Sequence, residues 1–354
     1  MDERRPNLFS YGKKELSQDA MICWLIAWSF VERADDDEAL LRNCGAAFVE
    51  ALLRKHGQEL IRPINRASIH QQDKGIDVLA LVEDQEKRHV LLIEDKTHTG
   101  EHSGQLQRYL RDVRNGETSV GKEREDWDFL HPIYLKTGNQ SLANDRWITK
   151  SASPYRVFRR AEFLGVLNTY PGNNPILTDF RQHLKDREDD FLSFRDWRKD
   201  RQSEWSWAGW EGFFRRLECL LGDGDWSYVP NPSGGFLGYW WGGSPDQEAD
   251  VRTEVYQQLE INPGRPDRQR LCFKVSTESN DREALKAKWH ARIMDAGRSA
   301  DIEIHRPARM RVGKTMTVAE WESWLRFEGG RVDLERTVAR LRLAEEIVRK
   351  AAKS

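Results

Sequence analysis

Four charged residues stand in stretches that are otherwise apolar: Asp77 near the start of one stretch, and Glu94, Asp95 and Lys96 at the end of the next. A charge inside a buried segment costs free energy unless a partner compensates it. Two carboxylates a few ångströms apart repel each other unless a proton or a hard cation lies between them, and Mg2+ prefers a few carboxylates supplemented by water and phosphate oxygens. We therefore expect Asp77 and Glu94 to bind a divalent cation together.

Lys96 can add a positive charge to the same site. Side chains alternate along a strand, so Glu94 and Lys96 point to one face and Asp95 points to the other. Beside a cation, the Lys96 ammonium group could orient an attacking water, assist its deprotonation or neutralise charge that develops on a phosphate. The sequence leaves these three roles open.

An amide and a phenol follow at helical spacing. The pattern from Gln105 to Val113 predicts a helix, with Ser103 as a plausible N-cap. Gln105 and Tyr109 are one turn apart and therefore share a helix face. A helix that begins just beyond Lys96 could present both side chains to a nucleic-acid phosphate near the cation.

The strands that must position these residues are 76–82 and 89–96, which are rich in Val, Leu and Ile and are joined by a polar segment. This pattern predicts a hairpin of buried strands that places Asp77 beside Glu94. The apolar spacing predicts further elements in a fixed order around the hairpin. They are helices over residues 17–31 and 38–56, a strand near 60–69, and a strand over 129–136 after the Gln105 helix.

At these residues the chain resembles the PD-(D/E)xK nuclease superfamily, specifically the branch with a RecB-type Gln-h-x-x-Tyr motif, in which h is an apolar residue. The residues that carry the resemblance are Asp77, the triplet Glu94-Asp95-Lys96 and the segment from Gln105 to Tyr109. Ile76 stands where the family name has a proline. The resemblance covers roughly residues 8–140.

The resemblance implies an α/β fold with a restriction-endonuclease-like α-β-β-β-α-β core, one or two Mg2+ or Mn2+ ions, and hydrolysis of DNA phosphodiester bonds. The catalytic residues that it implies are Asp77, Glu94, Lys96, Gln105 and Tyr109. It implies metal binding by Asp77 and Glu94, by the backbone carbonyl of Asp95, and by Glu15, which is similar to an acid that members often add from the first helix. Bacterial DNA processing or defence against foreign DNA would be compatible roles.

Each assignment has a structural alternative. Glu94 and Lys96 could form a surface ion pair of little energetic value, although the unbroken apolar run before them argues against an exposed edge. Asp77 could be a turn residue, and the Gln105 helix could present an ordinary solvated face. Glu15 could be a charge that favours a helix start.

Histidine and cysteine positions argue against a zinc site. His98 and His102 flank the end of the lysine strand, but no Cys or third His lies at matching spacing, so solvated loop histidines are expected. The four cysteines are scattered along the chain without a paired spacing. This distribution predicts reduced, mostly buried thiols.

Composition limits the class of protein. The formal net charge is −2, so the chain does not have the uniformly basic character of a DNA-coating protein, and a nuclease does not need it. No signal-peptide pattern follows the charged N-terminus, and the longest apolar stretch, residues 21–30, is too short to span a bilayer. We expect a cytoplasmic protein without a membrane partner.

Two domains are expected: residues 1–200 as the nuclease domain and residues 201–354 as a tryptophan-rich α+β domain. A polar loop over 137–154, a charged helix over 177–200 and a linker over 198–202 are predicted before the composition changes. The second domain would recognise a substrate, a protein partner or a trigger. Its aromatic residues could stack on bases or form an interface, or could be the core of a small sheet.

Two other functions compete with the nuclease. One is a non-cleaving nucleic-acid-binding protein on a nuclease fold, against which the intact Asp77, Glu94 and Lys96 argue. The other is an effector that is inactive alone and is activated by a protein partner through the C-terminal domain.

Overall fold

The computed structural model describes residues 7–10, 16–31, 35–97, 100, 104–120, 127–231, 234–249, 251–262, 265 and 269–353. The predictions made for Glu15, His98, His102 and Ser103 fall outside these residues. The chain forms two compact units, of which the first comprises residues 1–140 and 144–189 and the second residues 141–143 and 190–354. The segment expected to be a linker, residues 198–202, lies within the second unit and contributes to the 3-10 helix η4 (Lys199–Glu204).

The first unit is built on one mixed sheet of five strands in the order β1-β2-β3-β4-β5. These strands are β1 (Arg66–Asp73), β2 (Ile76–Glu83), β3 (Arg88–Lys96), β4 (Phe129–Lys136) and β5 (Arg156–Arg159). The pairs β1–β2 and β2–β3 are antiparallel, whereas β3–β4 and β4–β5 are parallel. β3 is the central strand, and its apolar run is buried because both faces of the sheet are covered.

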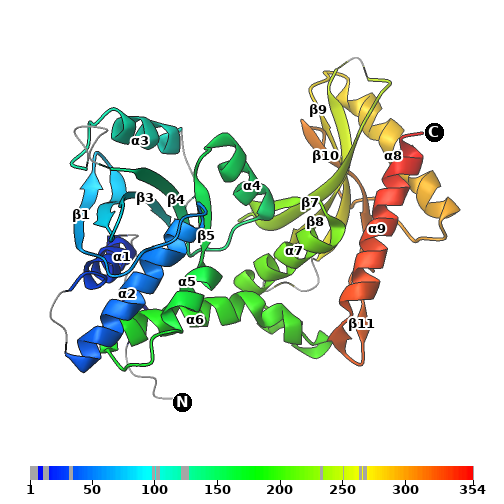
Figure 1. The fold of residues 1–354 in the computed structure, drawn as a ribbon. Helices are drawn as coiled ribbons and strands as arrows, with labels where there is room; N and C mark the ends of the chain where they lie inside the picture. The colour runs from blue at the N-terminus through cyan, green and yellow to red at the C-terminus, as the bar shows by residue number, and fades with distance from the viewer. Residues whose placement is uncertain are drawn as a thin grey trace. The chain divides into compact units, whose positions relative to one another are not determined.

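Helices lie on both faces of this sheet (Figure 1). The face formed by Val78, Leu91 and Ile93 packs on α1 (Leu16–Trp28), α2 (Asp36–Arg54), α5 (Arg160–Leu167) and α6 (Pro175–Leu192). The opposite face, which includes Leu79 and Leu92, packs on α3 (Gln105–Arg114) and on Ile148 of α4 (Leu142–Ser151). The element order therefore confirms the predicted α-β-β-β-α-β core.

Several predicted boundaries were wrong. The first strand begins at Arg66 rather than near residue 60, and the segment predicted as a loop contains α4. The charged helix ends at Leu192, and the 3-10 helix η3 (Ser193–Asp196) follows it. The N-cap of α3 is Gly104, in a left-handed conformation with φ 72° and without a side-chain cap, rather than Ser103. A polar helix with a narrow buried stripe, such as α4, lacks the broad apolar face that reveals a helix in sequence.

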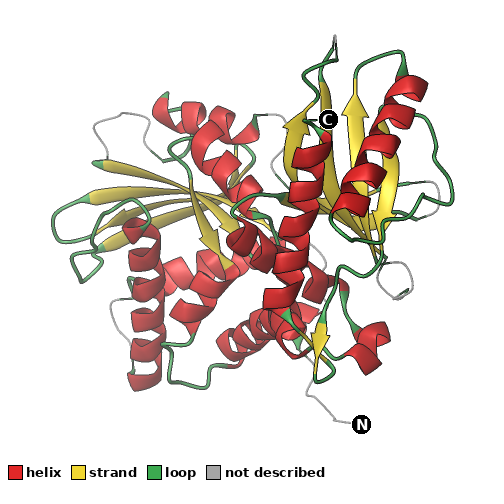
Figure 2. Ribbon diagram, turned by 90° about the vertical axis from the view of Figure 1, so that its right-hand side faces the viewer, coloured by secondary structure: helices red, strands yellow, loops and turns green. Residues whose placement is uncertain are grey.

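The second unit is α+β, as predicted. Its five-stranded sheet is antiparallel, in the order β10-β9-β8-β7-β6. The strands are β6 (Asp225–Val229), β7 (Phe236–Pro245), β8 (Thr253–Ile261), β9 (Arg270–Thr277) and β10 (Thr315–Trp321). The helices are α7 (Trp207–Leu221), α8 (Arg282–Ser299) and α9 (Leu334–Ala351), and β11 (Phe327–Glu328) with β12 (Arg331–Val332) forms a small ribbon. Figure 2 shows each of the two sheets flanked by helices.

Tryptophan forms much of the core of the second unit. Its buried tryptophans are Trp197, Trp205, Trp210, Trp226, Trp241, Trp289, Trp321 and Trp324. Of the alternatives considered for these aromatic residues, packing in the core explains most of the tryptophan enrichment. No described helix is both long and apolar enough to cross a membrane.

Candidate active site

Asp77 and Glu94 lie at one end of the β2–β3 hairpin. In the register of this pair Val78 faces Ile93, so the next residues along the ladder, Asp77 and Glu94, come side by side. Glu94 also lies near the end of a central strand, where a parallel neighbour, β4, covers its other edge. The hairpin thus brings together two carboxylates that the sequence separates by a strand and a turn.

Lys96 completes the group. Its Nζ atom forms an ion pair with Glu94 Oε1 and lies 3.8 Å from Asp77 Oδ2. The ammonium group also donates to the backbone carbonyl of Asp95, at 3.3 Å. One positive charge therefore lies among two carboxylates and a carbonyl oxygen, in a region almost closed to solvent.

Burial makes this carboxylate pair energetically unusual. The Glu94 side chain is only 1% exposed, and that of Lys96 is 8% exposed. Burial, followed by the nearby charge of Asp77, raises the pKa of Glu94 to about 8. Glu94 Oε2 is buried and accepts no hydrogen bond from any described residue. An acidic oxygen that is buried and unsatisfied is costly, and a cation would compensate it.

The carboxylate of Asp77 is held by two neutral donors. Its Oδ2 atom accepts the backbone N–H of Asp95 at 2.8 Å, and its Oδ1 atom accepts the side-chain amide of Gln72 at 3.1 Å. Both donors lie on strands adjacent to Asp77, β3 and β1. The orientation of this carboxylate is therefore fixed by the sheet itself.

α3 brings an amide and a phenol to the same place. Gln105 Nε2 donates to Glu94 Oε1 at 2.8 Å and to the Tyr109 hydroxyl oxygen at 2.7 Å. The Tyr109 hydroxyl donates in turn to the carbonyl of Gly75. The Tyr109 ring packs in the core beneath α3 with Leu106, so the helix is anchored while its polar groups face the carboxylates.

Gly75 is required in the turn that receives this hydroxyl. Its φ of 82° lies in the left-handed region that favours glycine. A Cβ atom at this position would lie 3.3 Å from the Tyr109 hydroxyl oxygen. The turn between β1 and β2 therefore lies so close to α3 that a side chain at position 75 would contact Tyr109.

Asp95 points to the opposite face of the sheet, as alternation along the strand predicts. Its Oδ1 atom accepts a hydrogen bond from Gln18 Nε2, and the Gln18 amide oxygen accepts the Thr137 hydroxyl at 2.8 Å. Burial, followed by the nearby Asp19, raises the pKa of Asp95 well above its usual value. Its carboxylate thus belongs to an environment built with α1, and only its backbone lies with Lys96.

Three residues at the site were missed by sequence reasoning. Gln72 and Gln18 hold Asp77 and Asp95, and the buried Tyr155 hydroxyl lies near Glu94, with its pKa raised by burial first and then by Glu94. Asp19 of α1 also lies near Asp95. Tertiary packing brings Gln18 and Tyr155 to the site from other elements, whereas Gln72 lies opposite Asp77 across the β1–β2 turn.

The carboxylate pair fits a divalent cation of the Mg2+ type. Asp77 and Glu94 supply hard oxygen donors, one of which, Glu94 Oε2, is buried without a hydrogen-bond donor among the described residues. Within those same residues no group of three or more His, Cys, Asp and Glu side chains could hold a metal ion. A pair is sufficient for Mg2+, which keeps several waters and is often bound through one or two carboxylates. Glu15 lies outside the described residues.

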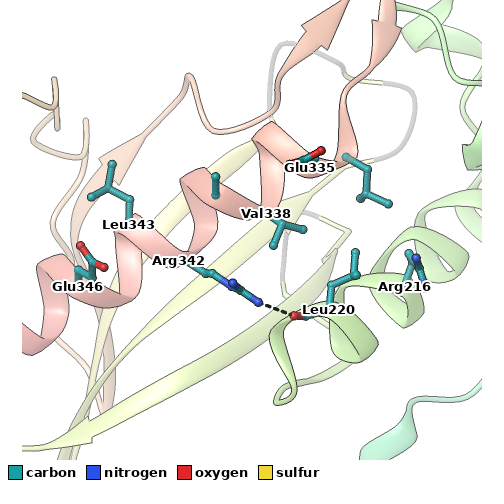
Figure 3. A pocket seen from close by; sticks show the side chains of 9 residues that line it. Arg216, Leu220, Glu335, Val338, Arg342, Leu343 and Glu346 are labelled. Carbon is teal, nitrogen blue, oxygen red and sulfur yellow. Dashed lines mark hydrogen bonds between the residues drawn. The ribbon is translucent and has the colours of Figure 1, made fainter.

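The second unit contains a cavity of a different kind, of about 780 Å3, between α7 and α9 (Figure 3). Leu220, Val338 and Leu343 contribute apolar surface, and Arg342 Nη2 donates to the Leu220 carbonyl at 3.1 Å. Its charged lining residues are two arginines and two glutamates, Arg216, Arg342, Glu335 and Glu346. The cavity has no buried acid pair with a lysine, so the Asp77 hairpin is the better candidate for catalysis.

Comparison with known proteins points to the same part of the chain. Residues 7–156 match the family model described as the PD-(D/E)XK nuclease superfamily. This stretch includes α1, β1, β2, β3 and α3, and it contains every residue described above at the carboxylate pair, including Gly75 and Tyr155. No curated protein and no solved structure matches the chain.

Proposed function

We propose that the protein is a metal-dependent nuclease that hydrolyses DNA phosphodiester bonds, and the match of residues 7–156 to the PD-(D/E)XK nuclease superfamily supports this proposal. The observation that carries the proposal is the pair formed by buried Glu94 and partly buried Asp77, with Lys96 between them. A structural ion pair needs one carboxylate for one lysine. The second carboxylate, with an unsatisfied oxygen on Glu94, is explained by a cation.

In the proposed mechanism Asp77 and Glu94 would hold Mg2+ or Mn2+. When bound, such an ion polarises a phosphate and lowers the pKa of a coordinated water. Asp77 is kept in place by the Asp95 N–H and the Gln72 amide, so it binds without reorganisation. Lys96, which reaches both carboxylates, supplies a positive charge where the attacked phosphate becomes more negative.

Gln105 and Tyr109 would position the substrate rather than the ion. Gln105 already donates to Glu94 and to Tyr109, so a phosphate oxygen near Glu94 would lie within reach of the same amide. Tyr109 fixes the turn at Gly75 and thereby the entrance to the hairpin. Both side chains are placed by a helix whose apolar side is buried, which limits their motion.

The outer side of α3 supports a nucleic-acid substrate. Arg108, Arg111 and Arg114 are exposed on this helix, at successive spacings of three residues. Arg108 also lies over the Tyr109 ring, with its guanidinium carbon 5.1 Å from the ring centroid. Arginines at this position could bind the phosphate backbone beside the carboxylate pair.

The proposal is tested by cleavage assays on the full-length protein. Linear, circular and single-stranded DNA and a single-stranded RNA would be incubated with wild type and with Lys96→Ala, in Mg2+, Mn2+ or EDTA. We expect DNA cleavage that requires the metal and is lost in Lys96→Ala, but is retained in Lys87→Ala, a matched change at a half-buried residue of the β2–β3 turn outside the carboxylate pair. Cutting of circular DNA identifies an endonuclease, which suits defence against foreign DNA, whereas cutting only from ends suits DNA processing.

Absence of cleavage of every substrate with either metal would contradict the proposal. Cleavage that survives in Lys96→Ala would show that the protein is a nuclease but that this site is not its active site.

A further inference from the structure

Gln72 connects two acids that belong to different elements. Its side-chain Nε2 atom donates to Asp77 Oδ1 on β2, at 3.1 Å, and to Asp19 Oδ2 on α1, at 3.2 Å. Asp19 is 1% exposed, whereas Gln72 itself is exposed. The exposed Gln72 amide therefore bridges buried Asp19 of α1 and Asp77 of the hairpin through its two hydrogen bonds.

The backbone of Gln72 is unusual for this residue type. Its φ is 57°, in the left-handed region that residues with a Cβ atom rarely adopt. Such a conformation persists when the surrounding structure determines it, and it is concentrated at functional sites. Burial does not explain it here, since the side chain is exposed. The contacts that the conformation gains are the two hydrogen bonds of the amide.

The amide has a specific effect on Asp77. Asp77 Oδ2 accepts the Asp95 N–H and Oδ1 accepts Gln72, so one donor on each oxygen fixes the plane of the carboxylate. Each oxygen has a second lone pair, which remains available for a cation. Because the donor is neutral, it separates the like charges of Asp19 and Asp77 without placing a competing positive charge at the site.

We propose that Gln72 is a positioning residue that orients Asp77 for the divalent cation and links that carboxylate to Asp19 of α1. This inference rests on the proposed function, because it takes Asp77 as a ligand of the cation. Gln72 acts through Asp77 and has no part in the chemical step. Its loss should therefore weaken metal binding before it affects folding.

The test is Mn2+ binding to the full-length protein, measured from the free-ion signal in electron paramagnetic resonance. The principal variant is Gln72→Asn, because asparagine tolerates the left-handed backbone and keeps the amide but is one methylene shorter. We expect Mn2+ to bind about tenfold more weakly or worse, which is the usual effect of losing a partner that orients a metal ligand. Thermal unfolding without metal should change little.

Gln71→Ala is the matched control, since Gln71 is an adjacent exposed glutamine on the same strand. It should bind Mn2+ as wild type does. Equal affinity in Gln72→Asn and wild type would overturn the inference, and so would a lowered melting temperature with unchanged Mn2+ affinity, which indicates a purely structural role.

Asp77→Ala distinguishes failure of the proposed role of Gln72 from failure of the proposed metal site. If Asp77→Ala abolishes Mn2+ binding while Gln72→Asn binds Mn2+ normally, only the proposed role of Gln72 is wrong. If wild type binds no Mn2+, or if Asp77→Ala binds Mn2+ normally, the proposed metal site is wrong as well.

Discussion

At the scale of single residues, the two carboxylates of the hairpin oppose each other. Glu94 is buried beside Asp77, and one lysine has to compensate both. Removing one negative charge from such a group relieves repulsion, whereas removing the lysine increases it. Charged groups placed together at such a cost to folding are expected to contribute to binding or catalysis.

We predict that Asp77→Asn separates stability from metal binding. The amide keeps the shape of the side chain and removes one of the repelling charges, so the melting temperature without metal should be no lower than that of wild type. Wild type should gain about 2.7 kcal/mol at a metal concentration one hundred times its Kd, and the variant should gain almost nothing. Differential scanning fluorimetry with and without Mn2+ measures both effects.

Asp112→Asn, at an α3 residue paired with the exposed Arg111, is the control and should keep the full metal-dependent rise. An undiminished rise in Asp77→Asn would exclude Asp77 as a ligand.

How far the sequence predicts these residues depends on how local their relations are. Glu94, Lys96 and Asp95 are separated by one or two positions, so strand alternation alone predicts which of them share a face. Asp77 requires one further step, the pairing of two apolar strands across a short turn. Gln18 meets Asp95 through packing between α1 and the sheet, which no spacing in the sequence encodes. Gln72 lies opposite Asp77 across the tight β1–β2 turn, and it was missed because the first strand was expected near residues 60–69, which end before Gln72.

At the scale of elements, the site depends on how the β1–β2 turn meets α3. The Tyr109 hydroxyl donates to Gly75, and Gly75 has a positive φ at the close approach. The sequence predicted α3 and its start at Gln105 from the apolar spacing but not its N-cap, Gly104, because a glycine N-cap in a left-handed conformation leaves no side-chain signature. The helix α4 was missed for a similar reason, since its composition is that of a polar loop.

We predict that Gly75→Ala reduces activity more than its effect on stability explains. A left-handed alanine costs about 1–2 kcal/mol wherever it stands. At Gly75 the added Cβ also lies 3.3 Å from the Tyr109 hydroxyl oxygen, so this hydroxyl and the linked Gln105 must shift. The measurements are the free energy of unfolding in urea and the DNA cleavage rate.

Gly57 provides a control within the same unit. It has a φ of 71°, and a Cβ atom there would meet nothing within 4 Å. Gly57→Ala should therefore lose comparable stability and keep its cleavage rate. Equal rates in the two variants would mean that the contact between the turn and α3 does not influence the site.

At the scale of the whole molecule, the two units have separate cores, and the sequence predicts more about the first unit than about the second. The first unit has a family match, and the order of its core elements from α1 to β4 was predicted correctly, although α4 was missed. The α+β class of the second unit was predicted, and its tryptophans are mostly part of the core. Two aromatic residues of this unit, Trp207 and Tyr228, are instead exposed, with exposures of 37% and 50% and ring centroids 5.8 Å apart. Composition alone could not separate these exposed aromatics from the buried ones.

The response of the molecule to acid should be governed by a histidine cluster in the first unit. His131 and His89 are buried, and His89 Nδ1 lies 3.0 Å from His131 Nε2. Burial, followed by neighbouring His56 and His89, lowers the pKa of His131 to about 3, and burial lowers the pKa of His89 and His56 as well. The folded protein therefore keeps these rings neutral at a pH at which the unfolded chain binds protons.

The sign of the pH effect follows from this difference. A histidine with a folded pKa below the ordinary value of about 6.5 contributes its full stability above that pH and loses it as the pH falls toward the folded pKa. For His131 the window runs from about 6.5 down to about 3. At about 1.4 kcal/mol per pH unit, a fall from pH 6.5 to 5.0 should cost about 2 kcal/mol for this residue alone.

His131→Gln tests this directly, because glutamine retains hydrogen-bonding groups and cannot be protonated in this range. Urea unfolding of the first unit at pH 7.5 and 5.0 should show a smaller loss of stability in the variant than in wild type, even if the variant is less stable at pH 7.5. His70→Gln, on β1 and outside the cluster, should keep the wild-type difference between the two pH values. If His131→Gln and wild type lose equal stability, protonation of His131 does not drive acid unfolding, and the buried ring must be accommodated by rearrangement of the sheet around it.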